Sequence, residues 1–343
     1  PPTVSKKTLE IGTKLSPELA CLPLKINMGN YIESIEKGAD TIVITGSCGP
    51  CRFGYYGIVQ KEILKDLGYD VDIVILDSPK DDMKEFIARL RKIAGNNSIN
   101  SILSAVAKAF RVTEEMDELI ELSLKVRCRE KNKGKTDFVM YQFEKDIRET
   151  KGAREIRKCI EEYKKKLREI DIDSEYKPLR VGLVGEIYTL IEPFVNLQVE
   201  KKLGNMGVEV YRGLSVNSWV KYHLAPDIKF RLKEKRILKK ADPYLGLCIG
   251  GHAWQTVAHT INFSDMGLDG VIQIMPFGCM PEIVVESILP TISEQKKIPV
   301  MTLVVDEMTG EAGYQTRLEA FVDLLKQEEE NEKNECKTVL SWN

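Results

Sequence analysis

The chain has 343 residues, of which 43% are hydrophobic and 30% are charged, and its formal net charge is −2. These values are typical of a globular protein large enough for two domains. A charge this close to zero disfavours nucleic acid or anionic lipid as a general partner. No apolar run approaches the roughly 20 residues that cross a membrane, and the first residues show no apolar signal core. A cytoplasmic location is therefore expected.

The first part of the chain, residues 1–79, carries a pattern of alternating helices and strands. A helix is predicted over Leu24–Lys37, a strand over Thr41–Thr45, a helix over Tyr56–Leu67 and a second strand over Asp70–Leu76. A glycine- and cysteine-rich loop separates the first strand from its helix. This alternation is typical of α/β folds with a parallel sheet.

From residue 80 to residue 177 the hydrophobic period becomes that of helices. Helices are predicted around Met83–Leu90, over Ile102–Arg127 and over Phe138–Leu167. The third is dense in Lys, Arg and Glu, which we interpret as a solvated face. We expect this segment, with the polar linker Asp171–Lys177, to complete the first domain.

A second α/β pattern occupies residues 178–327, and a tail that we expect to fray follows at 328–343. The predicted strands are Arg180–Gly185, Val208–Tyr211, Tyr244–Ile249, Gly270–Met275 and Pro299–Val305. The predicted helices are Leu190–Leu203, Glu282–Leu289 and Gln315–Lys326. The expected fold class is therefore α/β, with two Rossmann-like domains built on parallel sheets and a helical segment between them.

Three of the eight cysteines stand two residues before a proline, namely Cys21, Cys48 and Cys279. Because proline favours the first turn of a helix, each cysteine is expected just ahead of a helix N-terminus. The N–H groups that point outward there stabilise negative charge, such as that of a thiolate or an anionic iron–sulfur cluster. Cys48 and Cys279 also follow predicted parallel strands, at the sheet edge where ligands bind.

Cys51 forms a Cys-Gly-Pro-Cys sequence with Cys48. Such a pair serves as a redox dithiol, as half of a zinc site or as two cluster ligands. A dithiol would leave the two distant Cys-x-Pro sites unexplained, and only three histidines are present to build a His-rich metal site. We therefore favour Cys21, Cys48, Cys51 and Cys279 as cluster and metal ligands. Whether Cys48, Cys51 or both are ligands stays open.

The aromatic residues beside these cysteines and the remaining cysteines have different contexts. Tyr55 and Tyr56 are placed to shield a cluster from water or to donate a hydrogen bond to sulfur. Cys159 lies in a helical pattern and Cys248 in a predicted apolar strand, so both are expected to be buried. Cys128 lies among charged residues near a helix end.

Acidic and imidazole side chains follow other predicted strands. Glu186 is expected to face the same cleft, where it either contacts a substrate or a group beside the cluster, or balances a helix dipole. His252 follows two glycines and is expected either to touch substrate and relay a proton or to cap its loop. Asp306, Glu307 and Glu311 follow the last strand and are expected to hold an arginine or a helix end.

Four segments resemble the acyl-CoA dehydratase activase-related proteins. They are SPELACLPLK (16–25), GSCGPCRFGYYG (46–57), MPFGCMPEIVVESILP (275–290) and DEMTGEAGYQTRLEAF (306–321). That group is part of the 2-hydroxyacyl-CoA dehydratase and benzoyl-CoA reductase superfamily, which also contains the double-cubane cluster proteins. The resemblance extends from Ser16 to Leu325 and is vague in the helical middle.

The resemblance implies stacked Rossmann-like domains with an oxygen-sensitive iron–sulfur cluster, [4Fe-4S] by preference, in the cleft between them. Mapped here, Cys21, Cys48 or Cys51, and Cys279 have that role. It also implies low-potential electron transfer or reduction, a separate ATP-dependent activator ATPase as partner, and an acyl-CoA or other small-molecule substrate. A homodimer is compatible with it. This chain has no GxxxxGK[ST] loop, so ATP chemistry belongs to the partner.

Some features depart from the family pattern. A double cubane remains an option, but it would need Cys128 or a second subunit to supply further ligands. No catalytic residue can be assigned, and Glu186 and His252 are the candidates. Two alternatives are a non-enzymatic module that carries or assembles clusters and a structural protein stabilised by zinc.

Overall fold

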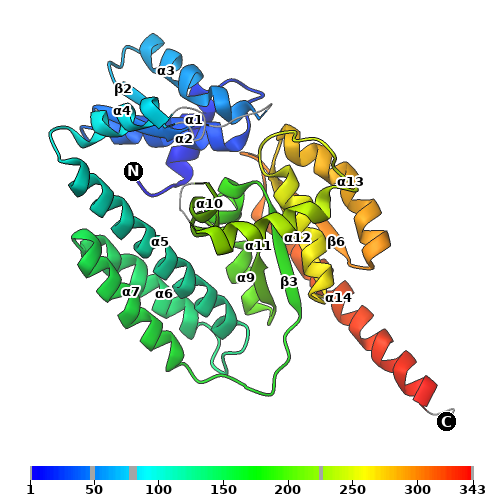
Figure 1. Cartoon of the computed structure of the whole chain (residues 1–343). Helices are drawn as coiled ribbons and strands as arrows, with labels where there is room; N and C mark the ends of the chain where they lie inside the picture. Colours follow the sequence, from blue (N-terminus) through cyan, green and yellow to red (C-terminus); the bar gives the residue numbers. More distant parts are fainter. Residues whose placement is uncertain (1, 47–50, 77–82, 224–226, 341–343) are drawn as a thin grey trace.

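The computed structural model describes residues 2–46, 51–76, 83–223 and 227–340. In these ranges the chain is α/β with two separate parallel sheets, which confirms the predicted fold class. Figure 1 shows a small N-terminal unit in blue, a group of long helices in teal and green, and a larger C-terminal unit. The last helix extends away from the body of the molecule.

The N-terminal unit has one two-stranded sheet. Strands β1 (Thr41–Thr45) and β2 (Asp72–Leu76) pair in parallel, with Thr41 opposite Asp72. Its helices are α1 (Lys6–Leu15), α2 (Leu22–Ile35), the short 3-10 turn η1 (Arg52–Tyr55) and α3 (Tyr56–Asp66). Apolar side chains of α2, β1 and α3 form one core. The predicted helices and strands of this region are thus present, with shifts of about two residues at their ends.

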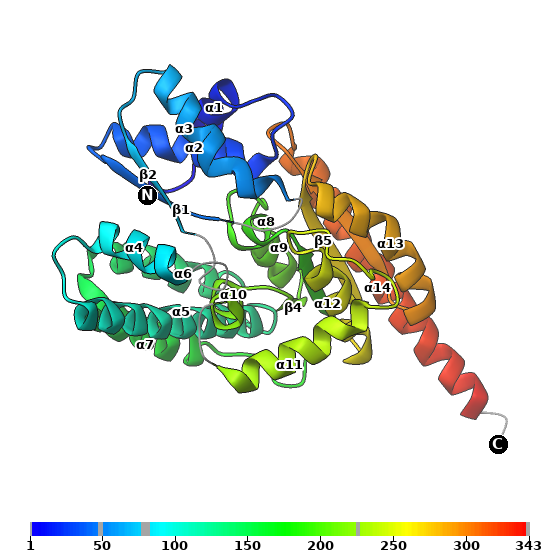
Figure 2. The same ribbon diagram turned by 45° about the horizontal axis from the view of Figure 1, so that its top comes forward.

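The helical segment begins on the N-terminal unit and ends on the C-terminal one. Helix α4 (Met83–Ala94) packs on β2, where Arg89 donates to the Ile75 carbonyl. Helices α5 (Ile99–Arg127), α6 (Lys135–Glu149) and α7 (Gly152–Arg168) lie side by side (Figure 2). The helix predicted over residues 138–167 is therefore two helices, broken at Thr150 and Lys151.

Ion pairs join this helical segment to the C-terminal unit. Arg129, just after α5, pairs with Glu209 on strand β4 (Glu209–Arg212) at 2.6 Å. Glu114 on α5 pairs with Lys221 on helix α10 (Val216–His223) at 2.5 Å. The domain boundary expected near residue 177 stays a prediction.

The C-terminal unit is built on a four-stranded parallel sheet in the order β4-β3-β5-β6. The strands are β3 (Arg180–Gly185), β4 (Glu209–Arg212), β5 (Gly270–Pro276) and β6 (Val300–Val305). Every residue of the central strand β5 is buried, as expected for a strand covered by helices on both faces. The helices are α8 (Ile187–Ile191), α9 (Val199–Asn205), α10 (Val216–His223), α11 (Ile228–Leu238), η2 (Lys239–Ala241), α12 (Ala253–Asp265), α13 (Met280–Lys296) and α14 (Glu311–Leu340).

One predicted strand is absent, because residues 244–249 form a loop. In this loop the Leu245 side chain is buried in the core, whereas the Leu247 side chain is 77% exposed. The Leu245 carbonyl accepts a hydrogen bond from Trp254 Nε1 instead of from a neighbouring strand. As a consequence Cys248, which we expected to be buried, is exposed.

Two helix predictions in this unit were also wrong in extent. Residues 190–203 do not form one helix, because Pro193 and the left-handed residues Leu197 and Gln198 separate α8 from α9. The helix predicted over Gln315–Lys326 is longer, since α14 extends from Glu311 to Leu340. No helix within the described ranges combines the length and the apolar character needed to cross a membrane.

Candidate functional site

Cys21 and Cys279 lie at helix starts, as the prolines predicted, and Cys51 lies at the start of a helical turn. Cys21 is the N-cap of α2, Cys51 is the N-cap of η1 and Cys279 is the N-cap of α13. Each has an extended backbone, and proline lies in the first turn of α2 and of α13. Cys48 lies outside the described residues.

Hydrogen bonds from the Arg52 side chain bring these three cysteine loops together. Arg52, directly after Cys51, donates one hydrogen bond to the Leu19 carbonyl at 2.9 Å and another to the Gly278 carbonyl at 2.6 Å. Leu19 stands two residues before Cys21, and Gly278 stands directly before Cys279. The N-terminal and C-terminal units therefore meet at the predicted ligands.

A loop of the C-terminal unit closes against Cys51. Gly251 has a left-handed φ of +57°, and a Cβ added to it would lie 2.9 Å from Pro281 Cγ and 3.8 Å from Cys51 Sγ. Glycine alone permits this approach without strain. The loop before α12 thus forms part of the wall around the cysteines.

The charge of one carboxylate acts on all three cysteines. Burial is the main cause that raises the pKa of Cys21, Cys51 and Cys279, and in each case the Glu186 charge raises it further. Charge on Cys21 also raises the pKa of Cys279. Because such interactions fall with distance, the three thiols and Glu186 belong to one site.

Glu186 has the helix-capping role that the sequence allowed. Its carboxylate accepts hydrogen bonds from the N–H groups of Tyr188 at 3.0 Å and Thr189 at 2.9 Å. Burial nevertheless raises the pKa of Glu186, because these bonds only partly offset the loss of water. A carboxylate fixed in this way stays directed at the start of α8, near the cysteines.

The aromatic residue Tyr56 contacts one of the candidate ligands, Cys21. Its hydroxyl is hydrogen-bonded to Cys21 Sγ, and its ring is 3% exposed. Burial, followed by charge on Cys21, raises the pKa of Tyr56. Phe53 packs against the ring with a centroid separation of 5.2 Å. Tyr55, in contrast, is 69% exposed.

A buried polar network lies behind Cys279. Glu282, in the first turn of α13, accepts hydrogen bonds from Thr256 at 3.0 Å and from Gln273 at 2.9 Å. Gln273 in turn accepts from Thr302 at 2.8 Å. Burial raises the pKa of Glu282 to about 7. The network connects the start of α13 with strands β5 and β6 and with α12.

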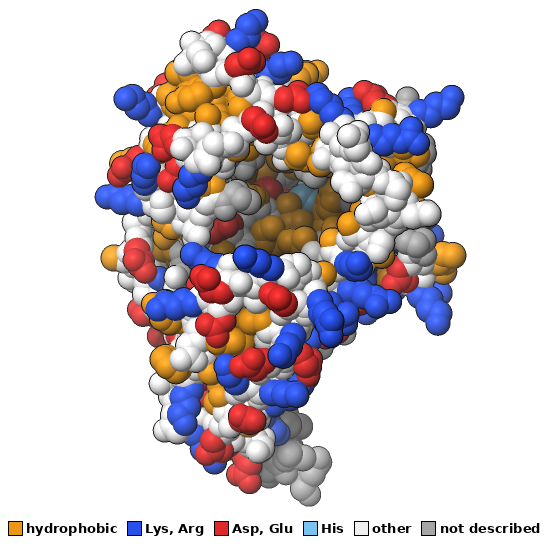
Figure 3. Space-filling model, turned by 90° about the vertical axis from the view of Figure 1, so that its left-hand side faces the viewer, with side chains coloured by type: hydrophobic (Ala, Val, Ile, Leu, Met, Phe, Trp, Pro, Cys, Tyr) orange, Lys and Arg blue, Asp and Glu red, His pale blue; other side chains and the backbone are white. Residues whose placement is uncertain are grey.

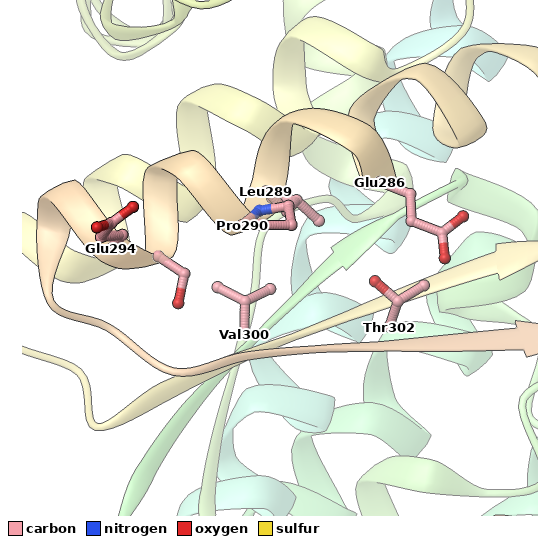
Figure 4. A pocket seen from close by; sticks show the side chains of 7 residues that line it. Glu286, Leu289, Pro290, Glu294, Val300 and Thr302 are labelled. Atoms are coloured by element: carbon pink, nitrogen blue, oxygen red, sulfur yellow. The ribbon is translucent and has the colours of Figure 1, made fainter.

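This network reaches a groove on the outside of the sheet. Figure 4 shows the groove between α13 and β6, with Glu286 on the helix and Thr302 on the strand at one end. The lining residues are Glu286, Leu289, Pro290, Ser293, Glu294, Val300 and Thr302. None of the described cysteines lines this groove, so it is separate from the cysteine site.

His252 lies at the start of α12, in the loop that contacts Cys51. It is the N-cap of the helix and makes no side-chain capping hydrogen bond. Burial, and after it the charge of His223, lowers the pKa of His252 to about 4. The imidazole is therefore neutral near pH 7.

The molecule is hollowed on the side seen in Figure 3. Hydrophobic side chains line the hollow, and an acidic and a histidine side chain are visible inside it. Clefts of this kind, mostly apolar with few polar groups, are where small molecules bind.

Of the three acidic residues after β6, which we expected to hold an arginine or a helix end, Glu311 lies in the first turn of α14, and none is shown paired with an arginine among the described residues. Glu307 pairs with Lys25 of α2, and Glu311 pairs with Lys202 at 2.5 Å. Asp306 accepts hydrogen bonds from the backbone of Met308 and from the Thr309 hydroxyl.

Sequence reasoning missed Arg52 and Glu282, and it assigned no role to Gly251. Arg52 and Glu282 could have been noticed because Arg52 directly follows Cys51 and Glu282 stands three residues after Cys279. The sequence does not indicate which carbonyls the Arg52 side chain contacts, because both carbonyls belong to segments that are distant in sequence. Among the described residues, which leave out Cys48, no three His, Cys, Asp or Glu side chains are arranged to hold a single metal ion.

Comparison with protein families identifies the chain. Residues 3–325 match the family model described as 2-hydroxyglutaryl-CoA dehydratase, D-component. The chain belongs to this family. The match covers nearly the whole sequence and agrees with the resemblance seen in the cysteine segments. Proteins of this family are known for binding iron–sulfur clusters, and they imply an activator component. No curated protein matches the chain.

Proposed function

We propose that this protein holds an iron–sulfur cluster, most simply [4Fe-4S], and uses it for low-potential electron transfer or reduction. The observation that carries the proposal is that Arg52 hydrogen bonds hold together the loops of Cys21, Cys51 and Cys279, which come from three separate segments. Family membership adds the relation to 2-hydroxyacyl-CoA dehydratase components. Cys48 is the fourth proposed ligand.

The residues present fit such a group in their chemistry. None of the three thiols is in a disulfide, and soft thiolates are the usual ligands of iron–sulfur clusters. Each lies at a helix or turn N-terminus, where N–H groups favour negative charge. The close approach of Gly251 to Pro281 and to Cys51 leaves no room for a side chain at position 251. Because burial raises the thiol pKa values, binding of the cluster would release protons from the cysteines.

The side chains around the cysteines then have definable roles. When bound, such a cluster takes up and passes on single electrons. The Tyr56 hydroxyl donates to the Cys21 sulfur, which stabilises added negative charge. When ionised, the Glu186 and Glu282 carboxylates would destabilise added negative charge on the cluster, and they would therefore favour a low reduction potential. Burial of Tyr56 and Cys279 keeps water away from the sulfurs.

The proposed partner is a separate ATP-dependent activator that supplies the electrons. The proposed substrate is an acyl-CoA or another small molecule, and His252 and Glu186 are the candidate residues for contacting it. His252 lies in the loop that also contacts Cys51, and its low pKa would leave its imidazole neutral and able to form hydrogen bonds with a substrate.

A redox dithiol formed by Cys48 and Cys51 is a weaker candidate. The attacking thiol of a dithiol oxidoreductase needs a lowered pKa so that it is present as thiolate. Burial instead raises the pKa of Cys51, and Glu186 and Glu282 raise it further.

Anaerobic purification followed by metal and sulfide analysis tests the proposal. We expect iron and acid-labile sulfide in similar amounts, and a brown protein that loses its colour in air. Zinc without sulfide would favour the zinc-stabilised structural protein and reject the proposal. A cluster that passes readily to an apo acceptor protein would favour the cluster carrier, whereas a retained cluster supports the electron-transfer role.

A further inference from the structure

The Arg52 side chain contacts backbone carbonyls close to two candidate ligands, Cys21 and Cys279, and Arg52 directly follows a third, Cys51. The two terminal nitrogens of its guanidinium donate hydrogen bonds to the Leu19 and Gly278 carbonyls. Gly278 has a φ of +71° and shares its peptide group with Cys279. One side chain thus spans three segments that are up to 259 residues apart in sequence, from Leu19 to Gly278.

Arginine is suited to this geometry, because its planar guanidinium has donors that point in different directions. A lysine ammonium at the end of a flexible stem cannot hold two separate carbonyls in a fixed arrangement to the same degree. Each charge-assisted hydrogen bond to a carbonyl is also stronger than a neutral one. The Arg52 side chain is exposed, so burial of its own surface contributes little to stability.

Arg52 also places a positive charge at the site. Its charge opposes the effect of burial on the pKa of both Cys21 and Cys51. A cation beside anionic sulfurs favours the more negative, reduced state of a bound cluster. Removal of this charge should therefore make the reduction potential more negative.

We propose that Arg52 is a positioning residue, which holds the Cys21 and Cys279 loops in register with Cys51 through its two carbonyl hydrogen bonds. This inference rests on the proposed function in one respect, namely that the bridge helps to retain a bound cluster and that the Arg52 charge affects its reduction potential. The bridge between the two units is a property of the cluster-free chain as well.

Hydrogen exchange on the cluster-free protein tests the bridge by itself. We compare wild type with Arg52→Gln and Arg52→Lys, and use Arg317→Gln as the matched control. Arg317 is also exposed and donates to a single backbone carbonyl, that of Thr302 at 2.7 Å, within the C-terminal unit. The amides of Ala20 and Cys279 form turn hydrogen bonds beside the two carbonyls, so they report on the loops.

In Arg52→Gln we expect these two amides to exchange roughly tenfold faster than in wild type, because two hydrogen bonds are lost. Strand amides at Val181–Val184 should be unchanged, which shows that the fold is intact. Arg317→Gln should leave Ala20 and Cys279 as in wild type. Unchanged exchange in Arg52→Gln would overturn the proposal, as would full recovery of wild-type exchange in Arg52→Lys.

Measurements on the protein with a bound cluster distinguish the effect of the two Arg52 hydrogen bonds from the effect of the Arg52 charge. Arg52→Gln should lose iron to a chelator roughly tenfold faster than wild type and should have a more negative midpoint potential. Arg52→Lys should also lose iron faster but keep a potential closer to that of wild type, because its charge remains. Equal chelation rates in all three proteins would overturn the positioning role.

The two hypotheses can fail separately. If anaerobic wild type contains no iron and sulfide, the proposed function fails, while faster exchange at Ala20 and Cys279 in Arg52→Gln still supports the bridge. If wild type holds a cluster and Arg52→Gln retains it with unchanged kinetics, the bridge fails and the proposed function stands.

Discussion

The Lys25 ammonium on α2 is paired with the Glu307 carboxylate two residues beyond β6, and the pair joins the N-terminal unit to the C-terminal one. Lys25 stands four residues after Cys21, about one helical turn, and its side chain is 4% exposed. The Glu307 side chain is 27% exposed. A cation this deeply buried needs its partner, because an unpaired charge in a protein interior is costly.

Loss of either member of this pair should destabilise the protein. Lys25→Met leaves Glu307 without its partner, and we expect roughly 2–3 kcal/mol less free energy of unfolding, below the full cost of a completely buried pair. Urea unfolding measures the difference. Lys6→Ala is the control, since Lys6 and Glu10 are exposed and 3.8 Å apart, and it should change stability by less than about 0.5 kcal/mol. Equal urea midpoints for Lys25→Met and wild type would show that the pair contributes nothing.

Much of the fold could be predicted, because local patterns determined it. The strands Thr41–Thr45 and Arg180–Gly185 have the predicted bounds, since short apolar runs between turns are typical of strands. The run at residues 244–249 looked similar but forms a loop. A short apolar run becomes a strand only where a sheet has a free edge beside it, and that is tertiary information.

The positions of two candidate ligands at helix starts were predictable, and the connections between their loops were not. Local Cys-x-Pro patterns place Cys21 and Cys279 at helix starts, and the structure has them there. The Arg52 bridge and the Lys25–Glu307 pair join residues far apart in sequence, which no local pattern encodes. Cys248 shows the same limit, because its exposure follows from a strand that does not form.

Substitution of the cysteines distinguishes ligands from core residues. Cys21→Ala and Cys279→Ala should each abolish cluster binding, because each removes a sulfur from the site. Cys159→Ala should keep full iron content, since Cys159 lies in the core between α5, α6 and α7. Iron per chain after anaerobic purification decides this. A full iron content in Cys279→Ala would remove the C-terminal unit from the proposed site.

Tyr56→Phe should change the reduction potential without removing the cluster. The variant keeps the buried ring and its contact with Phe53 but loses the hydroxyl that bonds Cys21 Sγ. Hydrogen bonds to the sulfurs stabilise the reduced state, so the midpoint potential should become more negative. Stability should fall by only about 1 kcal/mol. An unchanged potential would mean that the hydroxyl does not act on the ligand sulfur.

Gly251 should tolerate no side chain, in contrast to Gly246 in the same loop. Gly251→Ala places a methyl group against Pro281 at a left-handed φ, and we expect roughly 1–3 kcal/mol of destabilisation. Gly246 has no atom within 4 Å of an added Cβ, so Gly246→Ala is the matched control and should be close to neutral. Thermal or urea unfolding compares the two. Similar stability for both variants would show that the loop can move away from Cys51.

His252 should make the protein less stable in mild acid. Burial, and then the charge of His223, lowers the pKa of His252 to about 4 from the ordinary value of 6.5. Between pH 6.5 and pH 4 the unfolded chain therefore binds a proton that the folded chain does not, so the free energy of unfolding decreases as the pH falls. The total effect is at most about 3 kcal/mol.

Two variants check this assignment. His252→Gln should remove the His252 contribution, so that its loss of stability between pH 7 and pH 4 is smaller than that of wild type by up to about 3 kcal/mol. His223→Gln should raise the pKa of His252 only in part, because burial is the larger cause. NMR titration of the His252 imidazole, identified by its absence in His252→Gln, measures the pKa directly. A value near 6.5 in the folded wild type would show that the imidazole reaches water, and the acid dependence would then arise elsewhere.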